Sequence, residues 1–585
     1  MYILGISCYY HDASAALLKE GKIVAAAQEE RFTRKKHDTS FPIHAINYCL
    51  KNQNISIDKI DYIGFYEKPL LKFERLLSQH LETFPLSFKT FLSSTPSWIN
   101  EKLRIVKVIK KKLKYKKDIL FVEHHMAHAA TFLISPFKKA AILTIDGVGE
   151  WTTTAYGIGK NKEIHLMKEI RFPSSIGLMY STITAYLGFS VNNSEYKVMG
   201  LSPYGNMDRK KNPYYKKLTK TVDIKNDGSF GLDMSYFVYH YANRMPSKRL
   251  CDLLGGSIRK PNEKIKKRHK DIAAALQMLT EDIITNMLKH IHKITQCDDL
   301  IIAGGVALNS VYNGKIIKTT PFKRVWSQPD PGDGGTSIGV ASYIYNTILG
   351  NKRNYILKNA YLGPKYTTEQ IKSFLDKRKI KYYKFKNEKE LLETTANLIY
   401  NNNVIGWFQG RMEWGPRALG ARSILSSPCN KNMQEILNLK VKHRERFRPF
   451  APAVCEDDAL TYFKCDTPIP ELTDFMLIVY PINKKWHKKI PAVTHIDGSG
   501  RLQTIRKHKN PLYYNLIKKF GKLSGIPILI NTSFNIRGEP IVCTPNDAYK
   551  CMMGTEIDYL VVDKFLIKRM DNLKHIWDSE KYAKD

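Results

Sequence analysis

The chain has 585 residues, of which 43% are hydrophobic and 25% are charged, as in soluble globular proteins of two or three domains. This composition excludes a disordered chain, a collagen-like repeat and a small disulfide scaffold. Lysine and arginine outnumber aspartate and glutamate by 92 to 55, and the resulting charge of +37 favours anionic ligands or acidic surfaces. A lysine-rich compositional bias explains the same excess, so the charge by itself selects no partner.

The distribution of apolar residues and cysteines predicts a cytoplasmic protein. No apolar run approaches the ~18 residues that a membrane span needs, so no membrane partner is expected. The first residues read as a strand rather than as a signal peptide. The nine cysteines are dispersed and form no C-x-x-C pair, which is typical of reduced thiols. The oligomeric state stays open.

Two strand–turn–strand units are expected in the first part of the chain. Residues 2–7 and 22–27 are apolar, strand-like segments on either side of a turn at His11-Asp12. A similar unit follows at 141–158, where the turn contains Asp146 and Gly147. The repetition favours a duplicated architecture.

Further along the chain, helical spacing predicts a helix over 267–292, followed by a buried strand over 299–302 and a second helix from 336 to about 345. Residues 205–262 show no clear period and are interpreted as an irregular insertion. The polar, basic stretch 350–365 is expected to be a linker. We therefore expect domains over 1–355 and 366–585, the second one of mixed helices and strands.

The segment from Glu123 to Ala130 contains an H-x-x-x-H spacing. On a helix, His124 and His128 share one face, which suits two imidazoles bound to one metal ion, although two surface histidines would show the same spacing. Asp146 and Asp333 lie in glycine-flanked turns after apolar strands. Two histidines with two carboxylates favour a Lewis-acid metal over a closed structural zinc site.

Three glycine-rich turns, at 146–149, 304–309 and 330–337, each follow a predicted strand. Backbone N–H groups in such turns can hold phosphates, so Gly147, Gly304, Gly305 and Asn309 are candidate nucleotide contacts together with Asp146. The sequence contains no G-x-x-x-x-G-K-[ST] motif, which excludes a P-loop, and no Rossmann fingerprint.

A basic group of residues lies in the second domain. Arginines at 411–422 and basic residues at 442–448 are interleaved with Trp414 and prolines, and Arg501 and Arg537 lie downstream. Arginine grips phosphate or carboxylate oxygens with two hydrogen bonds, so a pocket wall is predicted, with the strand-like segment 528–535 as its floor. A solvated charged surface is the alternative. His11 is a candidate general base, with Asp12 orienting or replacing it.

Taken together, these motifs resemble the O-carbamoyltransferases, a family that includes nodulation-factor and antibiotic carbamoyltransferases. The resemblance rests on residues 5–17 and 28–38, the histidines at 124–128, residues 196–201, the turns at 304–309 and 330–336, Gly-Pro-Arg-Ala-Leu-Gly at 415–420, and residues 531–538. It covers nearly the whole chain except the 205–262 insertion.

The resemblance implies an α/β fold with an actin-like ATPase (ASKHA, threonylcarbamoyltransferase-like) N-terminal domain and an α+β YrdC-like C-terminal domain. It implies that carbamoyl phosphate is cleaved in the C-terminal domain, that ATP adenylates the carbamate, and that a hydroxyl of a small-molecule or sugar acceptor is carbamoylated in natural-product biosynthesis. ATP and carbamoyl phosphate are then co-substrates, and Fe(II) is the expected metal.

Carried over residue by residue, the resemblance makes His11 the base and Lys36 a nucleotide contact. The implied metal ligands are His124, His128, Asp146 and Asp333, and the implied carbamoyl phosphate residues are Arg417, Lys442, Arg448, Arg501 and Asn531. Two other functions stay open. One is a tRNA threonylcarbamoyl-type modification enzyme, which the charge would suit, and the other is a non-catalytic nucleic-acid-binding protein with an ATPase-like fold.

Overall fold

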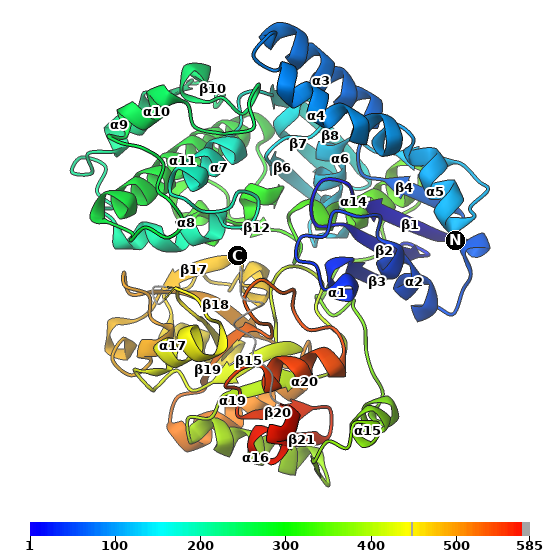
Figure 1. Ribbon diagram of the computed structural model, residues 1–585, viewed down its shortest axis with the longest axis vertical. Coiled ribbons are helices and arrows are strands. Elements are labelled where there is room, and N and C mark those ends of the chain that lie inside the picture. Colours follow the sequence, from blue (N-terminus) through cyan, green and yellow to red (C-terminus); the bar gives the residue numbers. More distant parts are fainter. Residues whose placement is uncertain (446–447, 576–585) are drawn as a thin grey trace. The chain divides into compact units, whose positions relative to one another are not determined.

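The computed structural model describes residues 1–445 and 448–575, and the chain forms two compact units (Figure 1). Unit 1 comprises residues 1–26 and 39–357, and unit 2 comprises residues 27–38 and 358–585. Unit 1 ends at residue 357, whereas the sequence places the boundary at residue 355. Residues 27–38, however, group with unit 2, because Arg34 donates hydrogen bonds to the carbonyls of Pro540 and Ile541 at 2.7 Å and Arg31 to that of Gly415 at 2.9 Å.

Unit 1 contains two five-stranded sheets of the same topology, in the orders β3-β2-β1-β4-β5 and β12-β11-β6-β7-β8. In each, the first strand pairs antiparallel with the next strand in the chain and parallel with a later one. The strands are β1 (Tyr2–Ser7), β2 (Ser14–Lys19), β3 (Lys22–Gln28), β4 (Tyr62–Phe65), β5 (Ile119–Phe121), β6 (Lys139–Ile145), β7 (Thr152–Lys160), β8 (Glu163–Arg171), β11 (Asp299–Ala303) and β12 (Arg324–Trp326). The duplication and the actin-like ATPase fold are thus confirmed.

The first hairpin differs from the sequence expectation in its second strand. The strand that follows the His11 turn is β2, and β3, which covers the expected 22–27 segment, is the next strand outward. β2 begins Ser-Ala-Ala, and because small residues have low strand propensity the segment gives little strand signal in the sequence.

The helices of unit 1 confirm the periodic segments. α11 covers the predicted 267–292 helix, and α14 begins at Thr336. The bounds are α2 (Ile43–Asn52), α3 (Pro69–Thr83), α4 (Phe88–Ser97), α5 (Ile105–Leu113), α6 (His124–Ala129), α7 (Ile176–Tyr186), α8 (Glu195–Leu201), α9 (Tyr215–Thr219), α10 (Lys248–Leu253), α11 (Lys267–Thr295), α12 (Ser310–Asn313), α13 (Ile316–Thr319) and α14 (Thr336–Tyr343). The 205–262 segment is more regular than expected, since it holds α9, α10 and a hairpin of β9 (Val222–Ile224) and β10 (Phe230–Leu232).

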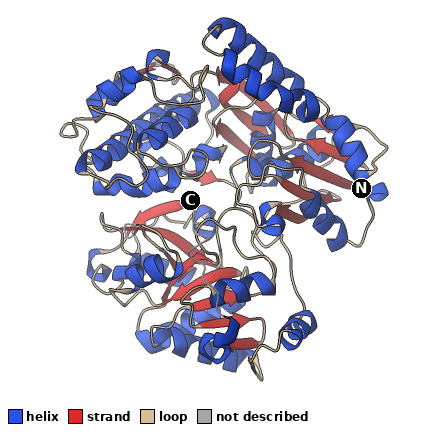
Figure 2. Cartoon of the chain, viewed as in Figure 1, coloured by secondary structure: helices blue, strands red, loops and turns tan. Residues whose placement is uncertain are grey.

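Unit 2 is built on one mixed nine-stranded sheet, in the order β13-β21-β20-β14-β15-β19-β16-β18-β17, with helices packed on it (Figure 2). Helices α16 and α19 cover a core that includes Trp407, Leu529 and Phe520. The strands are β13 (Tyr383–Lys384), β14 (Ile405–Phe408), β15 (Arg422–Ser426), β16 (Ala451–Cys455), β17 (Ile478–Pro481), β18 (Ser499–Ile505), β19 (Ile528–Ser533), β20 (Tyr559–Val562) and β21 (Phe565–Lys568).

The helices of unit 2 are α1 (Glu30–Thr33), α15 (Thr368–Lys377), α16 (Glu388–Tyr400), α17 (Met433–Ile436), α18 (Glu456–Tyr462), α19 (Pro511–Ser524) and α20 (Pro545–Met553). The mixed α+β composition expected for the second domain is confirmed. Among the described residues of both units, no helix combines the length and the apolar character needed to cross a membrane.

Candidate active site

Four residues that lie far apart in the sequence meet in the interior of unit 1. His124 and His128 lie one turn apart on α6, Asp146 follows β6, and Asp333 begins a short 3₁₀ turn that leads into α14. Their ligand atoms all lie within 4.8 Å of one another, and all four residues are buried. We call these residues the His–Asp group.

The side chains of the His–Asp group point at a common centre. Nε2 of His128 lies 2.9 Å and Nε2 of His124 lies 3.3 Å from Oδ2 of Asp146, and the two Nε2 atoms are 3.2 Å apart. Oδ1 of Asp333 lies 3.5 Å from Nε2 of His128. In the part of the chain that the structure describes, neither carboxylate oxygen of Asp333 has a hydrogen-bond partner.

This arrangement fits a divalent cation. Two buried carboxylates carry a strong desolvation cost unless a positive charge compensates them, and the oxygens of Asp333 are aimed inward without a donor. Two imidazoles and two carboxylates form a ligand set suited to first-row metals such as iron. The roles of the four residues as ligands stay a prediction.

The charges of the His–Asp group shift the pKa values of its own members. Burial would raise the pKa of Asp146, but hydrogen bonds from His124 and His128 hold it well below its usual range. Burial would likewise lower the pKa of His128, but Asp146 and Asp333 raise it to about 9. The carboxylates therefore favour positive charge at this point, whether it is carried by protons or by a metal.

Glu150 fixes the start of α6. Its buried carboxylate accepts hydrogen bonds from the backbone N–H of His124 at 3.1 Å and from that of Lys68 at 2.7 Å. The third histidine of the segment, His125, points elsewhere, and its Nδ1 lies 2.7 Å from the hydroxyl of Thr144. Glu150 gives no signal in the sequence, because a lone glutamate four residues after Asp146 forms no motif.

His11 lies beside the His–Asp group. Its Nδ1 is 3.0 Å from Oδ2 of Asp12, and its Nε2 is 3.7 Å from Oδ2 of Asp333. Burial would lower the pKa of His11, but Asp333, Asp12 and Asp146 raise it to about 10. Asp12 therefore holds the ring by one nitrogen and leaves the other directed at the group.

The glycine-rich turns also adjoin the His–Asp group. A Cβ on Gly304, whose φ is +90°, would lie 2.2 Å from the carbonyl oxygen of Ile145, and a Cβ on Gly305 would lie 3.1 Å from Oδ1 of Asp146. The backbone N–H of Gly304 donates to the carbonyl of Pro331 at 2.8 Å, which joins the 304–309 turn to the 330–337 turn. Only glycine permits this approach at position 304.

Two residues predicted to contact the nucleotide, Asn309 and Lys36, lie beside other polar or charged side chains of the protein. Asn309 caps α12 through the backbone N–H of Tyr312 at 3.1 Å, and its amide pairs with that of buried Gln277, both contacts at 3.1 Å. Lys36 lies in unit 2, where it is close enough to Lys442 to help lower the pKa of that lysine. The glycine turns belong to unit 1. A nucleotide-binding role of Lys36 stays a prediction.

A second group of predicted residues gathers on the sheet of unit 2. Asn531 lies on β19 opposite Ala451 of β16, and its amide donates to Gln503 of β18 at 2.6 Å and to the carbonyl of Ala418 at 3.2 Å. Arg501 lies two residues before Gln503 on the same strand, and alternate residues of a strand share a face. Because Ala418 follows Arg417, the 415–420 segment lies over this face.

Lys442 lies at the end of β19, and Arg448 lies near Lys442. The ammonium of Lys442 donates to the carbonyl of Ser533 and to the side-chain oxygen of Asn535, the latter at 2.8 Å. Burial, with Arg444 and Arg448 nearby, holds the pKa of Lys442 well below its usual range. Arg448 forms an ion pair with Glu445 at 3.2 Å. The structure thus brings the five predicted carbamoyl phosphate residues, which we call the basic group, to one region of unit 2.

Comparisons with known proteins cover both units. The family model described as "Carbamoyltransferase N-terminus" matches residues 2–342, and that described as "Carbamoyltransferase C-terminus" matches residues 396–569. The uncharacterized protein sll1178 of Synechocystis sp. is 44% identical over 97% of both chains. The nodulation protein NolNO of Sinorhizobium fredii is 33% identical over 97% of this chain and 80% of its own. The nodulation protein NolO of Bradyrhizobium diazoefficiens is 32% identical over 78% of this chain and 81% of its own.

Solved structures show only a distant likeness. HypF of T. kodakarensis has a TM-score of 0.31 and 11% identity, and the likeness covers 61% of this chain and 49% of HypF. Component A of the (R)-2-hydroxyglutaryl-CoA dehydratase of Acidaminococcus fermentans has a TM-score of 0.30 and 12% identity, over 59% of this chain and 97% of that one.

Proposed function

This chain belongs to the carbamoyltransferase family, and we propose that it is an O-carbamoyltransferase that uses carbamoyl phosphate and ATP to carbamoylate a hydroxyl group of a small-molecule or sugar acceptor. The family establishes a carbamoyl-transferring enzyme. The observation that carries the rest is the His–Asp group, which lies beside His11 and beside two glycine turns suited to phosphate. A base, a cation site and a phosphate cradle are the parts that activation by ATP and transfer to a hydroxyl require.

In the first step, the basic group binds carbamoyl phosphate. Arg417, Arg448 and Arg501 are suited to hold phosphate oxygens by paired hydrogen bonds. Asn531, whose amide N–H donates to Gln503, would accept from the carbamoyl amide through its Oδ1. Attack of water breaks the bond between the carbamoyl carbon and the bridging oxygen, or between that oxygen and phosphorus, and gives carbamate and phosphate.

In the second step, a carbamate oxygen attacks the α-phosphorus of ATP and pyrophosphate leaves, so that carbamoyl-AMP forms. The 146–149 and 304–309 turns would let the phosphates approach the backbone closely in this step, because Gly147 and Gly305 carry no side chain beside Asp146. The His–Asp group would hold the cation, for which Fe(II) is the expected ion. When bound, the cation supplies positive charge that offsets both the two carboxylates and the phosphates.

In the third step, the acceptor oxygen attacks the carbamoyl carbon, AMP leaves, and the hydroxyl proton passes to Nε2 of His11. Asp12, on Nδ1, fixes the tautomer that leaves Nε2 as acceptor. Asp333 and Asp146, which raise the pKa of His11 together with Asp12, are carboxylates that the cation would neutralise, so a loaded site would lower this pKa and favour the neutral ring.

The test is formation of AMP and pyrophosphate from ATP, with and without carbamoyl phosphate, by Fe(II)-loaded protein. We expect formation that depends on carbamoyl phosphate, a loss of at least about a hundredfold in His124→Ala, and no change in His165→Ala, which alters an exposed histidine on β8. Bound iron, measured separately, should fall in His124→Ala alone. Activity with threonine and bicarbonate in place of carbamoyl phosphate would contradict the proposal and favour the tRNA-modifying alternative.

A further inference from the structure

The helical hairpin of α3 and α4 carries its large apolar side chains on the outside. Of the 26 large hydrophobic residues that are exposed in the described chain, ten lie between Leu70 and Val106. Leu70, Leu81, Phe84 and Leu86 are 74%, 75%, 62% and 67% exposed, and Phe88 and Leu92 are about half exposed. We call these six residues the apolar ridge. A surface of this kind marks an interaction site when it is continuous.

The inner face of the hairpin is already satisfied, which explains why the ridge points outward. Lys72 and Arg75 are buried on α3, where Lys72 pairs with Glu67 and Arg75 donates to the carbonyl of Gly149 at 2.9 Å. The rings of Phe73 and Trp98 pack at 5.8 Å between the two arms. The basic residues of α3 thus face inward, while Leu70 and Leu81 face outward beside the exposed Glu74 and Glu82, so apolar side chains occupy part of a face that is polar in an ordinary surface helix.

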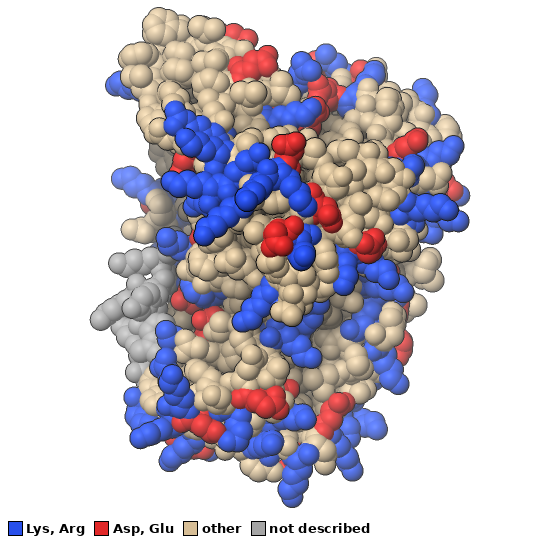
Figure 3. All heavy atoms as spheres, turned by 90° about the vertical axis from the view of Figure 1, so that its right-hand side faces the viewer, with Lys and Arg blue, Asp and Glu red and all other residues tan. Residues whose placement is uncertain are grey.

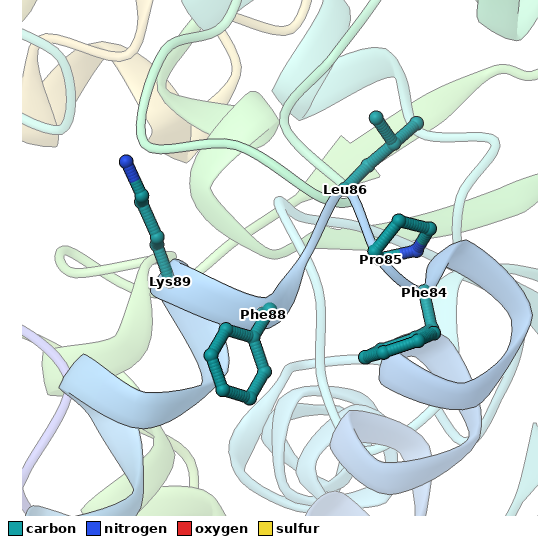
Figure 4. Close-up of a pocket in the computed structure, with 5 residues that line it drawn as sticks. All are labelled: Phe84, Pro85, Leu86, Phe88 and Lys89. Atoms are coloured by element: carbon teal, nitrogen blue, oxygen red, sulfur yellow. The ribbon is translucent and has the colours of Figure 1, made fainter.

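The tip of the hairpin forms a shallow hollow. Phe84, Pro85, Leu86, Phe88 and Lys89 line a pocket of about 280 Å³ (Figure 4). The rings of Phe84 and Phe88 lie edge to face at 6.3 Å, while Leu86 and Lys89 extend away from them. The tip therefore offers aromatic and aliphatic groups with one cationic side chain at the rim.

A strongly basic segment continues from the hairpin. Residues 104–117, which include α5, contain eight lysines and arginines and neither aspartate nor glutamate. Ile105, Ile109 and Leu113 anchor α5 inward, and Lys107, Lys111, Lys114 and Lys116 are exposed. Figure 3 faces the side on which α5 lies in Figure 1, and it shows a dense gathering of Lys and Arg there, below a mostly uncharged projection at the top of unit 1.

We propose that the apolar ridge and the basic segment together dock this enzyme on the surface of an anionic lipid bilayer. Apolar side chains that enter the headgroup region beside lysines that contact anionic headgroups are the two elements of interfacial binding. A nucleic acid would use the lysines but offers nothing to the exposed leucines, and an apolar protein partner would leave the lysines unused. The prediction of no membrane partner was based on the lack of membrane-spanning segments. Binding to a membrane surface does not need such a segment.

The experiment is sedimentation of the full-length protein with vesicles. We expect binding to vesicles of phosphatidylglycerol and phosphatidylcholine in equal parts, weak binding to phosphatidylcholine alone, and a decrease with salt. Leu81→Gln/Phe84→Gln/Leu86→Gln should weaken binding by about tenfold or more. Its matched control changes three exposed apolar residues of unit 2, Leu460→Gln/Ile496→Gln/Leu523→Gln, and should bind as the wild type does.

The basic segment is tested in the same way. Lys107→Gln/Lys111→Gln should weaken binding to anionic vesicles by about tenfold, and the exposed pair Lys484→Gln/Lys488→Gln should leave it unchanged. All these residues are exposed, and circular dichroism and unchanged ATP-dependent AMP formation confirm intact folding. The proposal is overturned if the wild type does not bind anionic vesicles or if the ridge variant binds equally well. It is also overturned if the ridge variant only turns a dimer into a monomer, which would make a second copy the occupant.

Discussion

Glu150 provides a sharp test of how the His–Asp group is positioned. Its carboxylate holds the first residue of α6 by accepting from the backbone N–H of His124, and it also accepts from Lys68. In Glu150→Gln one oxygen remains as an acceptor, while the other is replaced by an amide N–H that faces these donors. Hydrogen bonds to charged groups contribute about 1.5–3 kcal/mol each, so a loss of about 2 kcal/mol in the free energy of unfolding is expected.

The stronger effect should appear in metal binding. A residue that orients a metal ligand typically contributes a factor of about 10–100 in affinity, so Glu150→Gln should raise the Kd for Fe(II) or Mn(II) by that factor. Competition with a chelator measures the Kd, and denaturant unfolding measures the stability. Glu163→Gln, an exposed position on β8, is the matched control. An unchanged Kd in a destabilised Glu150→Gln protein would show that Glu150 supports the fold without placing His124.

Three further predictions concern other positions. Gly304→Ala should lower the free energy of unfolding by about 3 kcal/mol and abolish nucleotide binding measured by calorimetry, because the new Cβ meets the Ile145 carbonyl at a φ of +90°. The control is Gly525→Ala, which also has a positive φ but open space around it and should lower the free energy of unfolding by only about 1 kcal/mol. Burial lowers the pKa of His495 to about 4, so between pH 6.5 and 4 the unfolded chain takes up a proton that the folded chain does not. The free energy of unfolding therefore decreases as the pH is lowered through this range. In His495→Gln that fall, followed by urea unfolding, should be smaller by up to about 3 kcal/mol. Asn531→Ala should raise the KM for carbamoyl phosphate about tenfold or more and leave the KM for ATP unchanged, as initial rates will show.

Local sequence patterns predicted the structure correctly where one helix or one strand–turn–strand unit contains all the residues of the pattern. The H-x-x-x-H spacing placed His124 and His128 on one helical face, and both lie on α6 with their Nε2 atoms toward one centre. The repeated strand–turn–strand pattern predicted the duplication that the two sheets display. In these cases a period or a short spacing determines the geometry without help from the rest of the fold.

Other features depend on long-range packing, which no local pattern encodes. The Ser-Ala-Ala start of β2 has little strand propensity, and its pairing with β1 decides its conformation. Residues 27–38 leave unit 1 because Arg31 and Arg34 find carbonyl acceptors in unit 2. A leucine stripe on a helix normally predicts a buried face, and on α3 it is exposed because Lys72 and Arg75 occupy the inner one.

The place of Asp333 shows how packing rather than sequence proximity builds the His–Asp group. Asp333 leads directly into α14, and α14 lies so close to its neighbours that a Cβ on Gly339 would be 1.9 Å from the carbonyl of Ala127 on α6. On the other side, a Cβ on Gly5 of β1 would be 1.9 Å from the carbonyl of Ser337. Two glycines therefore set the depth of α14 between β1 and α6. Because α6 carries both histidines and the turn after β1 carries His11, the same close packing fixes the distances from Asp333 to the cation site and to the base.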